Sequence, residues 1–543
     1  MDNKFTIRIE SILGGHSPST HFASKDQIRS SLGIDPSWPI SDSQTDKYGK
    51  VASGLIRPTA ANKASGSTIN GAPLWLLRHP KGYGATPNET IYVYDSVGSV
   101  YSFAIPTSTF SGLGDLNDGG TAAGNGAAYN DNYVYFARAT TIARYGPLNG
   151  TPTFTDDYWV SSLSKTALVD TSYPPELFNS FPYPNHPLHR HSDGKLYIGD
   201  VVGNKGTIHY ISTTKSTVEG DTDNGSTYSK LQFGYGLWPT AIESYGSNLA
   251  IALYEGGVAS LQHPLNRAKI AFWDTTSANA NQITWVEFPD EIITGLRNID
   301  GVLYVASGSV QSRGFRISRF VGGYTFEEVF YSEDGEPPMT GAMDGSSKRL
   351  VMGSFCVIPE TSGCVFSLGL QKAALGNGIF NVMGCSNTSA SVTAVSFVSN
   401  LAFGLTLPYT GWSNGGSGGT NNGFDIPGTD YSQNPQTLWG QVNRIGQKFK
   451  ITKIRFPLAQ AVAANMTVTP KIYVDDGTAS YTGGQSNGLS IINNTNYPGA
   501  KNVVMRPENL TGEHNFWLEL KWTGSALCVV GLPITIEGEL IDD

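Results

Sequence analysis

Residues 186–200 read HPLHRHSDGKLYIGD: a short strand pattern, a polar turn at Asp193-Gly194, and a second strand of mostly apolar residues. Asp-Gly pairs favour tight hairpin turns because both residues readily adopt positive φ. We therefore interpret Asp193 as a turn residue rather than a catalytic one. His191 is given no chemical role either, because other residue types occupy its place in related segments: Tyr129, Tyr245, Asn298 and Phe397.

The same hairpin pattern recurs along the chain. From Ile91 to Leu401 there are six steps over 310 positions, which is about 52 residues per step and close to the ~40–50 of a propeller blade. A third strand usually follows each hairpin. Seven four-stranded blades around a central channel fit this length, with six or eight blades as alternatives. The hairpins span 73–96, 124–137, 186–200, 239–253, 293–307, 340–354 and 392–405.

The composition also favours an all-β protein. Of 543 residues, 63 are Gly and only 15% are charged, against the ~25% charged residues of an average domain. Aromatic residues are abundant, and we find no long segment with apolar residues at helical spacing. The net charge is −9, and the 36 Lys and Arg residues form no basic run. Duplex nucleic acid and anionic membranes are therefore not expected as partners.

The chain is expected to divide into three parts: an N-terminal strand and extended arm (1–70), a β-propeller (71–430), and a β-sandwich or jelly roll (431–543). The arm is polar, with isolated apolar anchors at Leu32, Trp38 and Ile56. We expect these anchors to dock on the chain's own domains or on neighbouring copies. KFTIRIESIL alternates in the same way as PITIEGELI near the C-terminus, which predicts that the two pair within the sandwich.

Several residue groups are candidates for chemistry, and none defines a site. His186, His189 and His191 lie close together in one segment. A strand could place two of them as a pair of metal ligands, but no residue at a suitable spacing supplies a third ligand. Asp221 and Asp223 resemble only the start of a calcium loop. No nucleophile elbow, P-loop, HExxH motif or sialidase Asp-box is present, although acidic residues are available: Asp95, Asp200, Asp274 and Glu291. We therefore assign no catalytic residue, metal or cofactor. A disulfide between Cys356 and Cys364 is an open alternative to two separate thiols.

The N-terminus, MDNKFTIRIESILGG, lacks the apolar region of a signal peptide, and no run approaches the ~20 apolar residues of a membrane helix. Export by a Sec signal and membrane insertion are therefore not expected. Aromatic residues beside glycines are the better lead for binding. Tyr235, Trp238, Tyr409 and Trp412 are candidate ligand or interface contacts, and burial between blades is the alternative.

The chain as a whole resembles structural proteins of tailed-bacteriophage virions that join a divergent β-propeller to a β-sandwich and an extended arm. The resemblance lies in ESILGGHSPSTHFASKDQIRSSLGIDP, GLIRPT, WGQVNRIGQKFKITKIRFPL and GLPITIEGELIDD. It implies a non-enzymatic virion component of the tail or host-adsorption apparatus. The implied partners are other virion proteins, copies of the chain itself, and a host surface glycan or protein. A carbohydrate-active propeller enzyme, with an acid pair at the channel mouth, and a lectin-like module are the alternatives.

Overall fold

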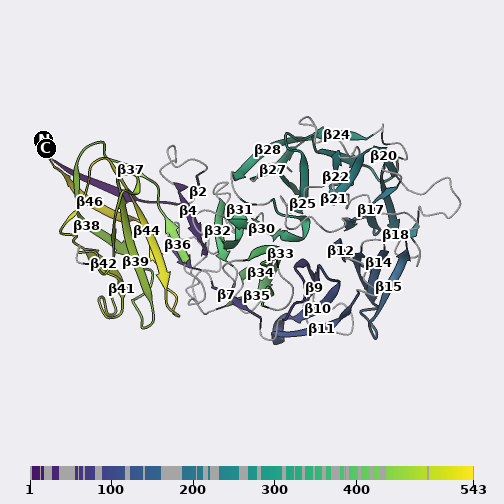
Figure 1. Cartoon of the computed structure of the whole chain (residues 1–543), viewed down its shortest axis with the longest axis horizontal. Helices are drawn as coiled ribbons and strands as arrows, with labels where there is room; N and C mark the ends of the chain where they lie inside the picture. The colour runs from purple at the N-terminus through teal and green to yellow at the C-terminus, as the bar shows by residue number, and fades with distance from the viewer. Residues whose placement is uncertain are drawn as a thin grey trace.

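The computed structural model describes the following residues: 3–12, 14–17, 27–35, 55–58, 60–64, 68–79, 89–116, 123–138, 141–160, 186–202, 205–211, 218–219, 231–255, 267–277, 280, 283–308, 314–322, 324–332, 335, 337–346, 349–356, 362–368, 379–384, 386, 390–400, 405–415, 420–428, 436–485 and 488–541. They form a ring of antiparallel sheets beside a two-sheet sandwich (Figure 1). Short 3-10 turns interrupt the strands at η1 (Ile105–Thr107), η4 (Thr340–Ala342) and η5 (Asp475–Gly477). None of the helices in this part of the chain is long and apolar enough to cross a membrane.

Seven antiparallel sheets form the blades of a β-propeller. The first three contain β8 (Pro73–His79), β9 (Thr90–Asp95), β10 (Ser99–Ala104) and β11 (Thr109–Asp115); β12 (Ala123–Asn130), β13 (Tyr133–Arg138), β14 (Thr141–Gly146) and β15 (Thr153–Val160); and β16 (Leu188–Arg190), β17 (Leu196–Val202), β18 (Lys205–Ile211) and β19 (Val218–Glu219), with β20 (Leu231–Tyr235) also on β18.

The fourth to seventh blades contain β21 (Leu237–Tyr245), β22 (Asn248–Glu255), β23 (Lys269–Trp273) and β24 (Thr284–Glu287); β25 (Ile292–Ile299), β26 (Val302–Gly308), β27 (Phe315–Gly322) and β28 (Thr325–Ser332); β29 (Met343–Ser346), β30 (Arg349–Cys356), β31 (Ser362–Leu368) and β32 (Ile379–Gly384); and β33 (Ser391–Asn400), β34 (Leu405–Ser413), β35 (Asn422–Gly428) and β7 (Ala60–Lys63). The predicted all-β fold with about seven blades is confirmed.

The first strand of each blade lies at the central channel. These inner strands contact one another around a closed ring, in the order β8, β12, β16, β21, β25, β29 and β33. In blades 2, 4 and 5 a two-residue turn leads from the first strand to the second. In blade 3 the turn contains Asp193 and Gly194, where Gly194 has a φ of 83° and Asp193 Oδ1 accepts from the Lys195 N–H at 3.1 Å. Asp193 is thus a turn residue, as predicted.

The seventh blade is completed by a strand from the opposite end of the chain. β7 pairs antiparallel with β35, with Asn62 opposite Ile426 and Ala61 opposite Pro427. It lies within the range that we assigned to the arm, and its sequence, AANK, carries no alternation of apolar residues. The ring is therefore closed by main-chain pairing between distant segments, and β7 becomes the outermost strand of blade 7.

The C-terminal domain is a β-sandwich whose two sheets enclose an apolar core. The first sheet contains β1 (Lys4–Ile9), β46 (Ile534–Leu540), β38 (Phe449–Pro457), β42 (Asn502–Met505) and β43 (Leu510–Gly512). The second contains β4 (Ser30–Leu32), β36 (Gln436–Trp439), β37 (Asn443–Arg444), β39 (Thr467–Val474), β40 (Ala479–Thr482), β41 (Ile492–Asn493) and β44 (Asn515–Thr523). β1 pairs with β46 from Lys4↔Glu539 to Ile9↔Ile534, so the predicted return of the N-terminus to the sandwich is confirmed.

The described parts of the arm are built into the chain's own sheets. β5 (Ile34–Asp35) and β6 (Leu55–Pro58) form a small sheet with β45 (Val530–Gly531), and β2 (Gly15–His16) pairs with β3 (Gln27–Ile28). Leu32 lies opposite Thr437 on the sandwich edge, and its buried side chain joins an apolar cluster with Phe315 and Phe366 of blades 5 and 6. The backbone of Ile56 pairs with Val530.

Leu32 and the backbone of Ile56 therefore lie against the chain's own domains, which is one of the two alternatives expected for these anchors. The reason is geometric: the arm runs between two domains that both offer it a surface, so its strands are satisfied without another subunit. Trp38 lies outside the described residues. In blade 6, Cys356 lies opposite Ser362 and Cys364 opposite Ser354, so the two cysteines are diagonal neighbours across the hairpin.

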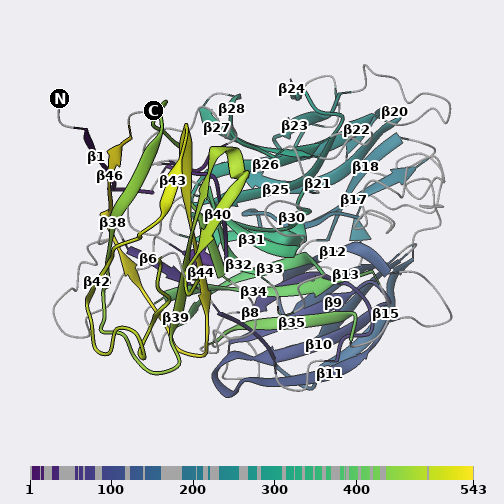
Figure 2. The same cartoon turned by 60° about the vertical axis from the view of Figure 1, so that its left-hand side comes forward.

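The sandwich lies directly beside the propeller (Figure 2), and the two domains share one continuous apolar core. This cluster runs from Val365 of blade 6 and Val392 and Trp412 of blade 7 to Ile454 and Phe449 of the sandwich. Both termini lie at the far end of the sandwich from the propeller (Figure 1). The two domains are thus joined by packing as well as by the linker between them.

Candidate binding site at the channel mouth

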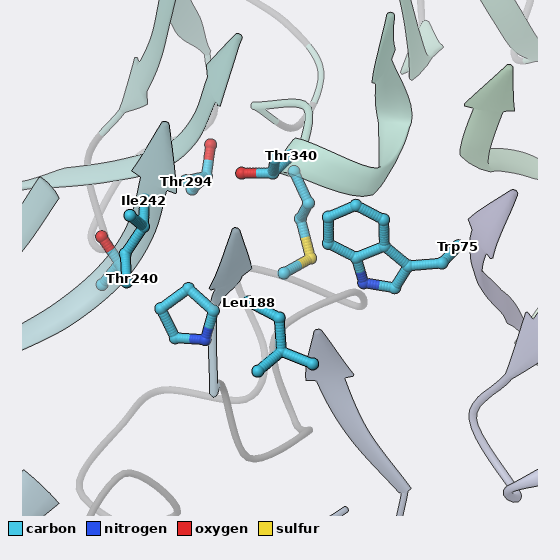
Figure 3. Close-up of a pocket in the computed structure, with 8 residues that line it drawn as sticks. Trp75, Leu188, Thr240, Ile242, Thr294 and Thr340 are labelled. Atoms are coloured by element: carbon cyan, nitrogen blue, oxygen red, sulfur yellow. The ribbon is translucent and has the colours of Figure 1, made fainter. Parts of the chain in front are cut away.

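Side chains from five inner segments line a narrow pocket in the channel (Figure 3). Trp75, Leu188 and Ile242 reach it from β8, β16 and β21, and its volume is only about 10 Å³, which is room for about one water molecule. The remaining lining residues are Pro187, Thr240, Thr294, Met339 and Thr340. A second, larger pocket shares Trp75 and Thr340 with it, and we call this larger pocket the cup.

Threonines of the narrow pocket tie adjacent blades together. Thr240 Oγ1 donates to the carbonyl of Ile293 at 2.7 Å, which links blade 4 to blade 5. Thr294 Oγ1 donates to the carbonyl of Pro338 at 2.8 Å, on the segment that leads into blade 6. Both hydroxyls are buried, so these bonds satisfy polar groups that would otherwise be costly to bury. These two hydrogen bonds hold blades 4, 5 and 6 in a fixed arrangement around the narrow pocket.

A charged network lies where the inner strands end. We define the channel-mouth cluster as Arg78, His189, Glu243, Arg297 and Asp344, which come from blades 1, 3, 4, 5 and 6. All seven inner strands run in the same direction, so residues near their carboxyl ends meet at one mouth of the channel. Residues distant in sequence are therefore brought together by the ring itself.

Arg297 is the centre of this cluster. Its Nη2 donates to Asp344 Oδ1 at 3.2 Å, and its Nη1 lies 3.9 Å from Glu243 Oε2. Burial alone would lower the pKa of the Arg297 guanidinium, but the carboxylates of Asp344 and Glu243 raise it overall. Arg78 forms a separate pair with Glu89. Each guanidinium at the mouth is therefore matched by at least one carboxylate.

A hydrogen-bond chain runs beside Arg297 across three inner strands. Ser244 Oγ lies 2.7 Å from His189 Nε2 and 2.8 Å from His191 Nδ1. His191 Nε2 lies 3.2 Å from the carbonyl of Ser247, so this nitrogen carries the proton and Nδ1 accepts from the Ser244 hydroxyl. Because that hydroxyl has one proton, His189 Nε2–H donates to Ser244 Oγ. Asn298 Nδ2 completes the chain by donating to the Ser244 carbonyl at 2.7 Å.

Burial sets the protonation of His189. It lowers the pKa of this imidazole below the ordinary value of 6.5, Glu243 opposes that shift, and Arg297 and His191 add to it. His189 and His191, two of the three histidines considered from the sequence, thus share a serine hydroxyl as a partner. Among the described residues, no group of three or more His, Cys, Asp or Glu side chains is arranged to hold a metal ion.

The cup at the mouth has a volume of about 200 Å³. Arg297, Asp344 and Arg78 contribute charged groups to its wall, and Thr340 contributes a hydroxyl. The apolar part of the wall and the backbone contacts come from Trp75, Leu76, Leu77, Gly341, Met343, Gly345 and Val395. Gly341 permits a close approach of blades, since a Cβ there would lie 2.2 Å from the carbonyl oxygen of Leu74.

The aromatic residues predicted as surface contacts divide into two groups. Tyr235 is 64% exposed, at the end of β20. Trp238, Tyr409 and Trp412 are only 4%, 5% and 3% exposed, so the prediction of a surface role is wrong for these three.

The buried aromatics fail as surface residues because they lie in strands rather than in loops. Tyr409 and Trp412 belong to β34. Tyr409 stacks on Phe424 at a centroid distance of 6.1 Å. Trp412 Nε1 donates to Asp425 Oδ1 at 2.9 Å, and its ring covers Gly423, which has no side chain to displace it.

Three of the acidic residues considered from the sequence, Asp95, Asp200 and Asp274, form hydrogen bonds or ion pairs within the fold. Asp95 is buried and accepts backbone N–H bonds from Gly71 and Ser99, while burial raises its pKa to about 6. Asp200 lies buried between His186 and His209, at 3.8 and 3.5 Å. Asp274 accepts from the N–H groups of the following turn, which lowers its pKa to about 2. Asp221 and Asp223 lie outside the described residues.

Sequence reasoning missed every member of the channel-mouth cluster except His189. The signal that could have found Glu243 and Arg297 is a charged residue three positions before the turn that ends an inner strand. Ala128 occupies the comparable position in blade 2. Position alone does not reveal which charged residues from different blades would meet.

Comparisons with known proteins support the fold only. No protein-family model matches the chain, and no curated protein matches it. Among solved structures, the extracellular domain of a hybrid two-component system from B. thetaiotaomicron is similar at 11% identity and a TM-score of 0.42, over 88% of this chain. This chain spans 59% of that one.

Two further solved structures are propeller proteins of different kinds. The WD40 repeats of RRP9 match at 8% identity and a TM-score of 0.39, over 68% of this chain and 100% of that one. An oxidoreductase (glucose dehydrogenase) of Thermus thermophilus matches at 11% identity and a TM-score of 0.33, over 59% of this chain and 98% of that one. At these values the likenesses carry no inference about activity.

Proposed function

We propose that this chain is a non-enzymatic structural protein of a tailed-bacteriophage virion, part of the tail or host-adsorption apparatus. Its partners in this proposal are other virion proteins, copies of itself, and a host surface glycan or protein. The observation that carries the proposal is the path of the N-terminal segment. Separate parts of residues 1–70 enter both sandwich sheets, the small sheet between the domains, and blade 7.

This path suits a component that is mounted at one end and displays the other. The shared apolar core and the threaded arm make the two domains one mechanical unit. Both termini lie at the end of the sandwich away from the propeller (Figure 1), so attachments made there leave the propeller face accessible. A rigid mount of this kind transmits position and force rather than performing chemistry.

The test is the presence of the chain in assembled particles. Particles are purified on a density gradient from lysates of cells that carry the gene, and the chain is quantified by mass spectrometry against a known particle protein. We expect the chain to co-sediment with particles in a fixed ratio. Recovery of the chain only in the fractions of free proteins would contradict the proposal.

A carbohydrate-active enzyme is the second candidate, because two carboxylates do meet at the channel mouth. Glu243 and Asp344 both reach Arg297. A glycosidase needs one carboxylic acid that is free to donate a proton to the leaving group, whereas both of these carboxylates are engaged by the Arg297 guanidinium. We therefore expect no turnover of a polysaccharide panel. Turnover that is abolished by Glu243→Gln would establish the enzyme instead.

A further inference from the structure

The cup at the channel mouth has the size of a small molecule. Its volume of about 200 Å³ is many times the ~10–15 Å³ that one water needs, which is enough room for a sugar ring. The adjoining pocket, which shares Trp75 with the cup, has room for only about one water molecule. The ligand must therefore be small, or be the end of a larger molecule that enters from the mouth.

The charged groups of the cup are matched in pairs, and they remain accessible. The side chains of Arg297 and Asp344 are 30% and 19% exposed while paired with each other. Arg78 is 39% exposed and paired with Glu89. At the Arg297–Asp344 pair, an anionic ligand would meet the carboxylate and a cationic ligand would meet the guanidinium. A hydroxyl group avoids this conflict, because it can donate to a carboxylate and accept from a guanidinium at the same time.

The rest of the wall is apolar. Trp75, Leu77, Met343 and Val395 line the cup opposite or beside the charged pairs. Water forms few hydrogen bonds with such a surface. A ligand with C–H groups on one face is stabilised when it covers the surface and removes it from water. The cup thus combines a hydroxyl-binding edge with an apolar wall. A pyranose ring presents the matching groups, with hydroxyls at its edge and C–H groups on its face.

We infer that the cup binds a neutral, polyhydroxylated ligand of monosaccharide size, either a free sugar or the terminal sugar of a glycan. Arg297 and Asp344 bind adjacent hydroxyls, and Trp75 and Leu77 contact the C–H face. The inference names a ligand class for the binding role proposed above. It does not depend on the location of the chain in a virion, because the cup lies within a single copy.

The first experiment measures binding to the full-length chain. Saturation-transfer NMR and calorimetric titration are carried out with glucose, galactose, mannose, N-acetylglucosamine and their methyl glycosides, with acetate and choline as charged controls. We expect saturable binding of at least one neutral sugar and none of the charged controls. A methyl glycoside that binds as well as its free sugar would identify the end of a glycan as the source, and preference for the free sugar would identify a soluble ligand. Binding of the charged controls alone, or of no member of the panel, would overturn the inference.

The second experiment places the ligand in the cup. Asp344→Asn keeps the size of the side chain, removes its charge, and leaves Arg297 beside Glu243. We expect about tenfold weaker sugar binding, the loss typical of one hydrogen bond to a charged group. The matched control is Glu327→Gln, which changes a similar arginine–carboxylate pair with Arg319 on the outer strands of blade 5. It should leave the affinity unchanged.

A third variant guards against a folding effect of the Asp344 change. Leu77→Ala shortens the half-buried apolar wall without touching a charged group, and we expect severalfold weaker binding. Equal affinity for the original chain, Asp344→Asn and Leu77→Ala would show that the sugar binds elsewhere. The virion proposal would be unaffected by that result, because it is judged by co-sedimentation with particles.

Discussion

At the scale of single residues, His16 shows how burial makes the arm sensitive to pH. Its Nε2 lies 2.8 Å from Ser31 Oγ, and its ring meets Phe366 of blade 6 edge-on at 6.2 Å. Burial lowers its pKa from 6.5 to about 4. The unfolded chain therefore takes up a proton between pH 6.5 and 4 that the folded chain does not. The free energy of unfolding should fall over this range by up to about 1.4 kcal/mol per pH unit from this group.

The prediction is tested by urea unfolding of the original chain and of His16→Gln at pH 7 and pH 5. Other buried histidines also lose stability in acid, because the pKa values of His79 and His189 are lowered too. The difference between the two proteins isolates His16. We expect the variant to lose roughly 1–2 kcal/mol less stability between these pH values. Equal losses would show that His16 is protonated alike in the folded and unfolded states.

Individual residues also show where sequence interpretation succeeds. Asp193 and Gly194 are predicted correctly because a tight turn is a local property of two residues. Tyr409 and Trp412 are predicted wrongly because glycines nearby indicate a loop, whereas Gly423 is the flat surface on which Trp412 packs. Arg297 and Asp344 meet only because the ring of blades closes. No spacing in the sequence encodes that meeting.

At the scale of elements, the closing strand β7 is the one that sequence interpretation could not find. It is short and polar, and it is specified by main-chain pairing with β35. Ala64 N–H donates to the carbonyl of Phe424 at 2.9 Å. Hydrogen-bonded pairs alternate in antiparallel sheets, so Asn62 also bonds to Ile426, whereas Ala61 faces Pro427, which has no N–H to give.

This alternation predicts opposite effects of proline at adjacent positions. Asn62→Pro removes a donor from the closing pair and should lower the free energy of unfolding by about 1–3 kcal/mol. Ala61→Pro removes an N–H that points away from β35, so its effect should be much smaller. Urea unfolding of both variants measures the difference. If the two prolines are equally tolerated, β7 does not close the ring by main-chain pairing.

At the scale of the whole molecule, the shared core predicts that the propeller and the sandwich unfold together. Apolar side chains of blades 6 and 7 and of both sandwich sheets form one cluster, and arm strands pair with each domain. Separating the domains would therefore expose apolar surface and break main-chain hydrogen bonds at the same time. Unfolding of either domain would therefore expose apolar side chains of the other.

Phe449→Ala tests this coupling from within the sandwich. Phe449 is fully buried, with its ring centroid 5.5 Å from that of Phe516 and 6.1 Å from that of Phe5. Removing the ring should cost about 3–5 kcal/mol. If the domains are coupled, calorimetry gives one transition at a lower temperature, and hydrogen exchange becomes faster in blades 6 and 7 as well as in the sandwich. Two transitions, with only the sandwich transition lowered, would show that the propeller is stable by itself and that the arm joins two independent bodies.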